Sequence, residues 1–219
     1  MILPPELLRE ALVNVAHIYC FRDYELLDDF RPRPGWTVVD IGGYLGIWTL
    51  RAARAVSQGG EVVYVEANPE LVSFASRSFE VNGFKNVRIV PRAIAPEKGA
   101  IKIYVPERRI NSSVLRGYSE IWGGVEREIE VRAITLETLL ELIGKPVDLI
   151  KMDIEGLEQD VLSSSREELR KKTVRRLVVE VHSPFSDPLD IAELLRNCGY
   201  RCIVYDVGLP SQSFVYAFT

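Results

Sequence analysis

A glycine-rich turn preceded by an acid is the part of this sequence best suited to bind a cofactor. Residues 36–48 read W-T-V-V-D-I-G-G-Y-L-G-I-W, a β-branched run that passes through Asp40 into the turn and then into an apolar helical segment. Glycines let the backbone approach a ligand closely, and the helix that follows begins with unpaired N–H groups. The stretch therefore predicts a nucleotide-type cofactor site. Its predicted lining residues are Gly42, Gly43, Tyr44 and Gly46.

The residues around the turn favour one class of cofactor. A dinucleotide-binding turn, G-x-G-x-x-G, would need glycine at position 41, where this chain has Ile41. The carboxylate of Asp40 would repel a pyrophosphate but attract an amino group or a sulfonium. Glu66 follows the next β-rich run and suits hydrogen bonds to ribose hydroxyls. These features favour S-adenosylmethionine over NAD, and Asp40→Ala is expected to weaken cofactor binding with little loss of fold.

Further polar residues stand at the ends of three later strands. Ligands of open α/β sheets bind outside the carboxyl ends of the strands, so these side chains are expected at the same edge as the glycine turn. They are Arg92, Asp153, Glu155, Glu180 and His182.

The elements that must position these residues alternate between strand and helix. Strands are predicted at 36–41, 61–66, 87–90, 147–152 and 176–182, with helices between most of them and two more β-like runs in the tail. Two of the helices are predicted to start at Asn68-Pro69 and Asp187-Pro188, each a capping side chain followed by proline. Parallel neighbours with right-handed crossovers are expected. The pattern predicts a Rossmann-like α/β fold with a mostly parallel sheet and helices on both faces.

The first 35 residues are predicted to form a helical extension packed on a single domain at 36–219. Apolar residues recur at helical spacing between positions 5 and 20 and indicate an amphipathic helix. Its expected buried face is Leu8, Leu12, Val15, Ala16 and Tyr19. The helix has either a structural role or, with Tyr24, the role of closing one side of the cofactor cleft.

A long polar connection at 106–127 separates two short strands predicted at 100–105 and 128–133. Loops of this length in compact domains are commonly functional or disordered. Its residues suit hydrogen bonds to a polar substrate, although a solvated loop is the alternative. The predicted substrate-binding residues are Arg109, Asn111, Ser112 and Ser113.

The composition disfavours several classes of protein. The net charge is −4 and the isoelectric point about 5.4, so no global basic field favours a nucleic-acid partner. No run approaches the roughly 18 apolar residues of a membrane span, and no secretory signal is recognisable at the start. Three cysteines are too few for a disulfide framework. A cytoplasmic protein without membrane association is expected.

Several motifs occur in the order seen in the FkbM-type S-adenosylmethionine-dependent methyltransferases, and the resemblance covers residues 36–182. They are V-V-D-I-G-G-Y-L-G, V-E-A-N-P-E with Ala67, A-I with Ala93, N-S-S, L-I-K-M-D-I-E-G-L-E and V-V-E-V-H. The resemblance implies a seven-stranded class I methyltransferase fold and methyl transfer to a hydroxyl of a sugar or small molecule. It also adds Ala67 and Ala93 to the predicted cofactor site. One departure is Gly43-Tyr44, where the family often has alanine-asparagine.

A hydroxyl acceptor must lose its proton, so a base or a metal ion is useful. His182 is the first choice for the base because its unperturbed pKa is nearest neutrality, with a purely local hydrogen-bonding role as the alternative. Asp153, Glu155 and Glu180 are the other candidates, and Asp153 is also expected to orient the acceptor or the cofactor. A divalent ion held by Asp153, Glu180 and His182 is a further option.

Two other functions remain as alternatives: an NAD-dependent oxidoreductase, and a methyltransferase-like binding module without activity. An N-methyltransferase is disfavoured because Asp153-Ile154-Glu155-Gly156 stands where such enzymes usually carry Asn/Asp-Pro-Pro-Tyr/Phe.

Overall fold

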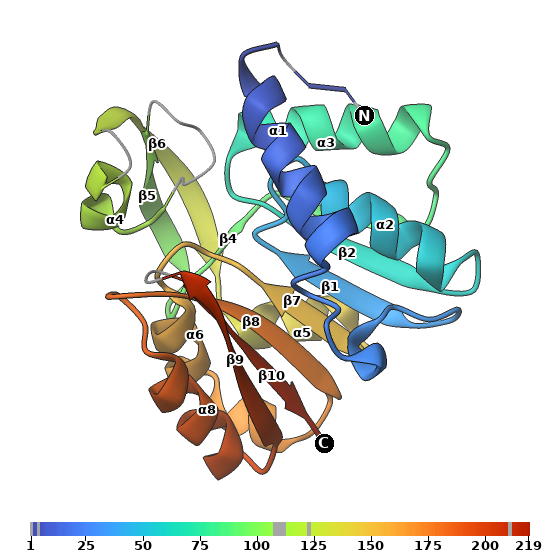
Figure 1. Cartoon of the computed structure of the whole chain (residues 1–219), viewed down its shortest axis with the longest axis vertical. Coiled ribbons are helices and arrows are strands. Elements are labelled where there is room, and N and C mark those ends of the chain that lie inside the picture. The colour runs from blue at the N-terminus through green and yellow to red at the C-terminus, as the bar shows by residue number, and fades with distance from the viewer. Residues whose placement is uncertain (1, 4, 107–112, 122–123, 210–211) are drawn as a thin grey trace.

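The computed structural model describes residues 2–3, 5–106, 113–121, 124–209 and 212–219. Its centre is a seven-stranded sheet in the order β3-β2-β1-β7-β8-β10-β9 (Figure 1). The first five strands in this order, β3, β2, β1, β7 and β8, are parallel, and β10 is antiparallel to both of its neighbours. The predicted fold class is therefore confirmed. The strands are β1 (Thr37–Ile41), β2 (Glu61–Val65), β3 (Val87–Val90), β7 (Leu149–Met152), β8 (Arg176–His182), β9 (Arg201–Leu209) and β10 (Gln212–Phe218).

Helices cover both faces of the sheet. Successive side chains of a strand point to opposite faces, and accordingly Val38 packs in one apolar cluster while Val39 packs in the other. The first cluster is covered by α2 (Ile47–Val56), α3 (Pro69–Val81) and the N-terminal segment. The second is covered by α5 (Leu136–Ile143), α6 (Glu158–Ser164), α7 (Arg166–Arg170) and α8 (Pro188–Asn197). All five residues of β1 are buried, as expected of a central parallel strand.

The helices α3 and α8 begin at the residues that the sequence indicated. The side chain of Asn68 accepts a hydrogen bond from the N–H of Glu70, and that of Asp187 accepts one from the N–H of Leu189. A proline follows each cap at the first helical position, where its missing N–H costs nothing. These caps fix where the chain turns back after β2 and β8.

A small second sheet interrupts the α/β alternation. β4 (Ala93–Ile94) pairs parallel with β6 (Val125–Ile134), and β5 (Gly99–Pro106) pairs antiparallel with it. The two predicted short strands are therefore present but longer. With α4 (Arg116–Ile121), this sheet stands to one side of the main sheet (Figure 1).

The N-terminal segment packs on the domain through a different face from the one predicted. It consists of η1 (Pro5–Leu7), α1 (Leu8–Val15) and a π-helical piece, η2 (Ala16–Phe21). Leu7, Ala11 and Ile18 are buried, whereas Leu8, Leu12 and Tyr19 are exposed. The buried residues keep helical spacing but lie one position before the predicted ones, so the prediction was wrong about the face of the helix. Of the predicted residues, Val15 packs partly against the apolar cluster.

None of the helices in the described ranges combines the length and apolar character that a membrane crossing requires.

Candidate active site

The carboxyl end of β1 holds a buried ion pair. Asp40 has no exposed surface, its Oδ1 lies 3.1 Å from Lys151 Nζ, and its Oδ2 accepts a 2.6 Å hydrogen bond from Thr49. Lys151 Nζ also donates to the carbonyl of Gly42 at 2.8 Å and lies 3.4 Å from Asp153 Oδ2. Burial would lower the pKa of Lys151, but the carboxylates of Asp40 and Asp153 raise it above its ordinary value. Lys151 is therefore a fixed cation between the ends of β1 and β7.

This burial changes the role expected of Asp40. A side chain without exposed surface cannot contact a ligand directly, so Asp40 acts by holding Lys151 and, through it, the glycine turn. Its loss would also leave Lys151 short of a partner in the interior, which is costly. The structure therefore predicts a loss of stability for Asp40→Ala, contrary to the expectation that this change leaves the fold nearly intact.

Gly42 lies where the turn after β1 meets the end of β7. Its φ is +73°, and a Cβ at this position would lie 1.7 Å from the carbonyl oxygen of Asp153. Only glycine tolerates both conditions. The turn and Asp153 are thus in direct backbone contact.

Glu66 ties the turn to the end of β2. Its Oε2 accepts a 3.0 Å hydrogen bond from the N–H of Tyr44, and its Oε1 accepts one of 2.8 Å from the N–H of Asn68. Tyr44 has a φ of +49°, and its carbonyl accepts a hydrogen bond from Tyr64. Burial raises the pKa of Glu66 to about 7, although the backbone donors act in the opposite direction. Tyr44 packs against the apolar cluster beneath α2.

The remaining predicted cofactor residues lie nearby or beneath the surface. Val90 O accepts hydrogen bonds from the N–H groups of Glu66 and Arg92, so these two residues adjoin at the ends of β2 and β3. Ala93 is buried in β4 and belongs to the apolar cluster on the side of α5 to α8, and Ala67 packs against that cluster. Close packing surrounds the other two glycines: a Cβ on Gly43 would meet Tyr64, and one on Gly46 would meet Phe79.

Four carboxylates surround His182 at the ends of β7 and β8, and we call this group the acidic cluster. His182 Nδ1 lies 2.8 Å from Glu158 Oε1. Its Nε2 lies 3.4 Å from Glu155 Oε2, 3.6 Å from Glu180 Oε1 and 3.7 Å from Asp153 Oδ1. All four predicted catalytic residues are therefore together, and Glu158 joins them. Glu158 was missed by the sequence analysis because its place in the first turn of α6 is typical of an exposed helical acid.

The acidic cluster is completed by residues far away in the sequence. The hydroxyl of Tyr24 donates to Asp153 Oδ2 at 3.0 Å and also bonds Glu180 Oε2. Gln212 donates to the other oxygen of Glu180. Tyr24 therefore reaches the site, as the closing role proposed for the N-terminal segment required. Gln212 carries no local sequence signal, whereas a lone lysine in an apolar strand, Lys151, was a signal that could have been used.

The charges of the acidic cluster alter the protonation of its members. Burial would lower the pKa of His182, but Glu155 and Glu158 raise it well above its ordinary value. Burial and the neighbouring Glu180 raise the pKa of Asp153. This shift disfavours the neutral imidazole that a general base requires, whereas the choice of His182 as the base depended on a pKa near neutrality. The role of His182 as the base stays a prediction.

Among the described residues, ligand atoms of Asp153, Glu155 and His182 converge, with one atom of each within 4.8 Å of the others. The predicted metal set had Glu180 in place of Glu155. Both Glu180 oxygens accept hydrogen bonds, from Tyr24 and Gln212, which favours Glu155 as the third ligand. A metal ion bound by either set stays a prediction.

The predicted substrate residues are only partly within the described ranges. Arg109, Asn111 and Ser112 lie outside them. Ser113 is buried; its hydroxyl donates to the carbonyl of Glu155 at 2.7 Å and accepts from the N–H of Leu115 at 2.9 Å. Ser113 thus holds the Glu155 backbone, which has a φ of +57°. Contact with a substrate stays a prediction.

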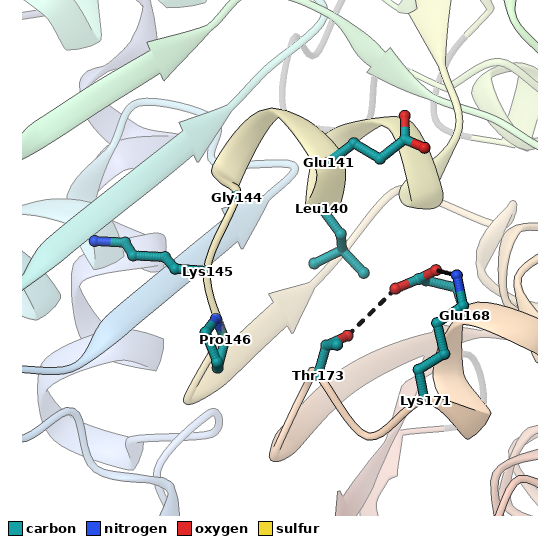
Figure 2. A pocket seen from close by; sticks show the side chains of 8 residues that line it. All are labelled: Leu140, Glu141, Gly144, Lys145, Pro146, Glu168, Lys171 and Thr173. Atoms are coloured by element: carbon teal, nitrogen blue, oxygen red, sulfur yellow. Dashed lines mark hydrogen bonds and ion pairs between the residues drawn. The ribbon is translucent and has the colours of Figure 1, made fainter.

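A pocket of about 350 Å³ lies away from these residues, beside the amino end of β7 (Figure 2). Three of its four charged lining residues form ion pairs, Lys171 with Glu168 at 2.5 Å and Lys145 with Glu61 at 2.8 Å. Thr173 also donates to Glu168. With its charges balanced and at the opposite edge of the sheet, this pocket shares no group with the acidic cluster.

This chain is similar to known methyltransferases. Methyltransferase sdnD of Sordaria araneosa is 26% identical over 191 residues, which cover 74% of this chain and 73% of sdnD. A solved S-adenosylmethionine-dependent methyltransferase from Aquifex aeolicus has a TM-score of 0.56 and 19% identity, with 95% of each chain covered. The solved FkbM methyltransferase from Methylobacillus flagellatus KT has a TM-score of 0.58 and 16% sequence identity. The match covers 84% of this chain and 43% of that protein.

The chain is shorter than some of its relatives. It spans 61% of the length of a curated relative in Jannaschia sp. (strain CCS1), to which it is 21% identical over 180 residues. The methyltransferase FkbM domain matches residues 40–202, a range that contains both the glycine turn and the acidic cluster. This chain therefore belongs to the FkbM methyltransferase family.

Proposed function

We propose that the chain transfers a methyl group from S-adenosylmethionine to a hydroxyl of a sugar or another small molecule. The observation that carries the proposal is the contact between two sites. The glycine turn and Glu66 form one, the acidic cluster forms the other, and Lys151 bonds to both. A donor held at the first and an acceptor held at the second would meet at Lys151 and Gly42.

The residues of the turn fit the proposed cofactor. Glu66 is half-buried and presents a carboxylate fixed through two backbone N–H groups, which suits the hydroxyls of a ribose. The carboxylate of Glu66 would repel a pyrophosphate, and Ile41 stands where a dinucleotide-binding turn needs glycine; both support S-adenosylmethionine over NAD. When bound, S-adenosylmethionine supplies a methyl group on a sulfonium, already activated for in-line displacement. The chain then has to align the acceptor and remove its proton.

The acidic cluster suits a hydroxyl acceptor. As the acceptor oxygen forms its bond to the methyl carbon, the carbon–sulfur bond breaks, its electron pair stays on sulfur, and the hydroxyl proton must leave. Carboxylates such as Glu155, 15% exposed in its side chain, are placed to receive that proton at the end of β7. A divalent cation, the other aid expected from the sequence, would serve the same purpose.

Cofactor binding is tested first. Titration calorimetry should show binding of S-adenosylhomocysteine and none of NADH, and Glu66→Ala should weaken the former. Glu70→Ala, an exchange of the same kind in the first turn of α3, is the control. Binding of NADH alone would overturn the proposal.

The acceptor chemistry is tested with methyl-labelled S-adenosylmethionine and a panel of sugars and small hydroxyl compounds. Product analysed by mass spectrometry should carry a methyl ether, which survives mild alkali, whereas a methyl ester does not. Label found only in esters or on nitrogen would refute the hydroxyl assignment. Cofactor binding without transfer to any acceptor would favour the binding module.

A further inference from the structure

We propose that Asp153, Glu155 and His182 bind a divalent cation. One ligand atom from each lies within 4.8 Å of the others. His182 Nε2 is 3.4 Å from Glu155 Oε2 and 3.7 Å from Asp153 Oδ1, longer than good hydrogen bonds. With metal–ligand bonds of about 2.1 Å, neighbouring ligands of one ion lie roughly 3 Å apart. Small side-chain rotations would bring the three atoms onto one ion.

Glu158 orients the histidine for this role. Its Oε1 lies 2.8 Å from His182 Nδ1 and accepts a 2.9 Å hydrogen bond from the N–H of Gly156. Its Oε2 accepts one of 2.9 Å from Ser186, and the residue has no exposed surface. A carboxylate fixed in this way holds the proton on Nδ1 and directs Nε2 at the cluster. Metal-ligating histidines are commonly oriented by such a carboxylate.

A second, independent observation concerns Asp153. Its Oδ1 is inaccessible to water and accepts no hydrogen bond from any residue in the described ranges, although its Oδ2 is bonded by Tyr24. A buried carboxylate oxygen without a donor is costly unless a cation or proton completes it. The same atom faces His182 Nε2. It therefore marks the position from which an ion would be bound.

The ligand set indicates the class of ion. One imidazole and two carboxylates suit Mn²⁺, Fe²⁺ or Zn²⁺ better than Mg²⁺ or Ca²⁺, which prefer oxygen alone. Three protein ligands leave further positions open, as in catalytic rather than structural sites. On the basis of the proposed function, we assign one open position to the acceptor hydroxyl. A bound cation would lower the pKa of that hydroxyl, whose proton passes to solvent as the oxygen attacks the methyl carbon.

The experiment is titration calorimetry of Mn²⁺ into chelator-treated full chain, with the loss of the free Mn²⁺ signal in electron paramagnetic resonance as a second readout. Wild type should bind one ion. Glu155→Gln, a partly exposed ligand, should weaken binding at least tenfold. Glu158→Gln should weaken it about tenfold or more through the histidine. Glu167→Gln, an exposed acid on α7, is the matched control and should bind as wild type does.

Thermal melts of each variant confirm folding before titration. Absence of Mn²⁺ binding by the folded wild type, or equal binding by Glu155→Gln, would overturn the cation site. S-adenosylhomocysteine is titrated into the same samples: its retained binding without Mn²⁺ binding refutes only the cation site. If the folded wild type does not bind S-adenosylhomocysteine, the proposed function is refuted instead.

Discussion

The acids at the ends of β1 and β2 are held differently from those at the ends of β7 and β8. Asp40 and Glu66 accept hydrogen bonds from nearby donors, such as Thr49 nine residues away and the N–H of Tyr44. In the acidic cluster, four carboxylates surround one histidine, and the added donors Tyr24 and Gln212 bond mainly to Glu180.

The difference lies in the balance of charge. At the glycine turn, a lysine and backbone N–H groups match the acids, so the turn is formed without a ligand. The acidic cluster keeps an excess of negative charge, which favours taking up a proton or a cation. The glycine turn is thus pre-organised for a neutral or cationic cofactor, and the acidic cluster is suited to removing a proton.

The largest expected effect on stability comes from breaking the ion pair between Asp40 and Lys151 at the glycine turn. Asp40→Ala leaves the buried Lys151 without its main partner and should lower the free energy of unfolding by about 3–5 kcal/mol. Urea denaturation measures this. Asp28→Ala, an exposed acid, is the control and should change little. Adding Lys151→Met to Asp40→Ala should recover part of the loss; no recovery would show that the ion pair is not the cause.

The backbone contact between the two ends is tested at Gly42. Gly42→Ala combines a left-handed φ with a clash against the carbonyl of Asp153 and should cost about 3 kcal/mol. Gly83→Ala has a similar φ of +71° with open space around it, so it should cost only about 1 kcal/mol. Equal unfolding midpoints for the two variants would show that the contact with Asp153 is relaxed in solution.

The acidic cluster is tested through Tyr24. Tyr24→Phe removes the hydroxyl that donates to Asp153 and Glu180 and should destabilise the fold by about 2 kcal/mol. Tyr19→Phe, an exposed tyrosine of the same segment, is the matched control. Differential scanning calorimetry compares the melting temperatures of the two variants. Equal melting temperatures would show that the hydroxyl of Tyr24 has no structural role.

The smallest effect is a pH dependence at Glu66. Its pKa of about 7 lies above the ordinary 4.5, so this group makes folding less favourable as pH rises through that interval. If the ionised form accepts the ribose hydroxyls, affinity for S-adenosylhomocysteine should rise about tenfold between pH 6 and 8. Calorimetry at both values measures it. Glu66→Gln should flatten the profile, and an unchanged slope in that variant would assign the titration elsewhere.

Local patterns predicted much of this molecule. The strand limits at 87–90 and 176–182 agree with β3 and β8, and the caps at Asn68 and Asp187 begin their helices as expected. Each of these features depends on neighbouring residues: β-branched runs, a capping side chain and a proline. Such short-range preferences are visible in a single sequence.

The errors all involve contacts that a short pattern does not contain. Glu158 is fixed by Ser186 and His182, and Glu180 by Tyr24, 156 residues away. Whether an acid becomes a ligand or an acceptor of hydrogen bonds depends on such distant donors. The face of the N-terminal helix was predicted wrongly for a related reason, because which face is buried depends on the distant surface on which the helix packs.

The placement of Tyr24 has a consequence for the order of folding. Tyr216 in β10 donates to the carbonyl of Asp23, 193 residues away, and Phe214 in the same strand packs edge-on against the ring of Tyr24. During synthesis, the N-terminal segment must wait for β10 before it can occupy its final place. Contacts so distant along the chain form late because closing the loop is entropically costly. We therefore expect a nascent chain truncated before β10 to have β1 and its turn in place while the acidic cluster is still open.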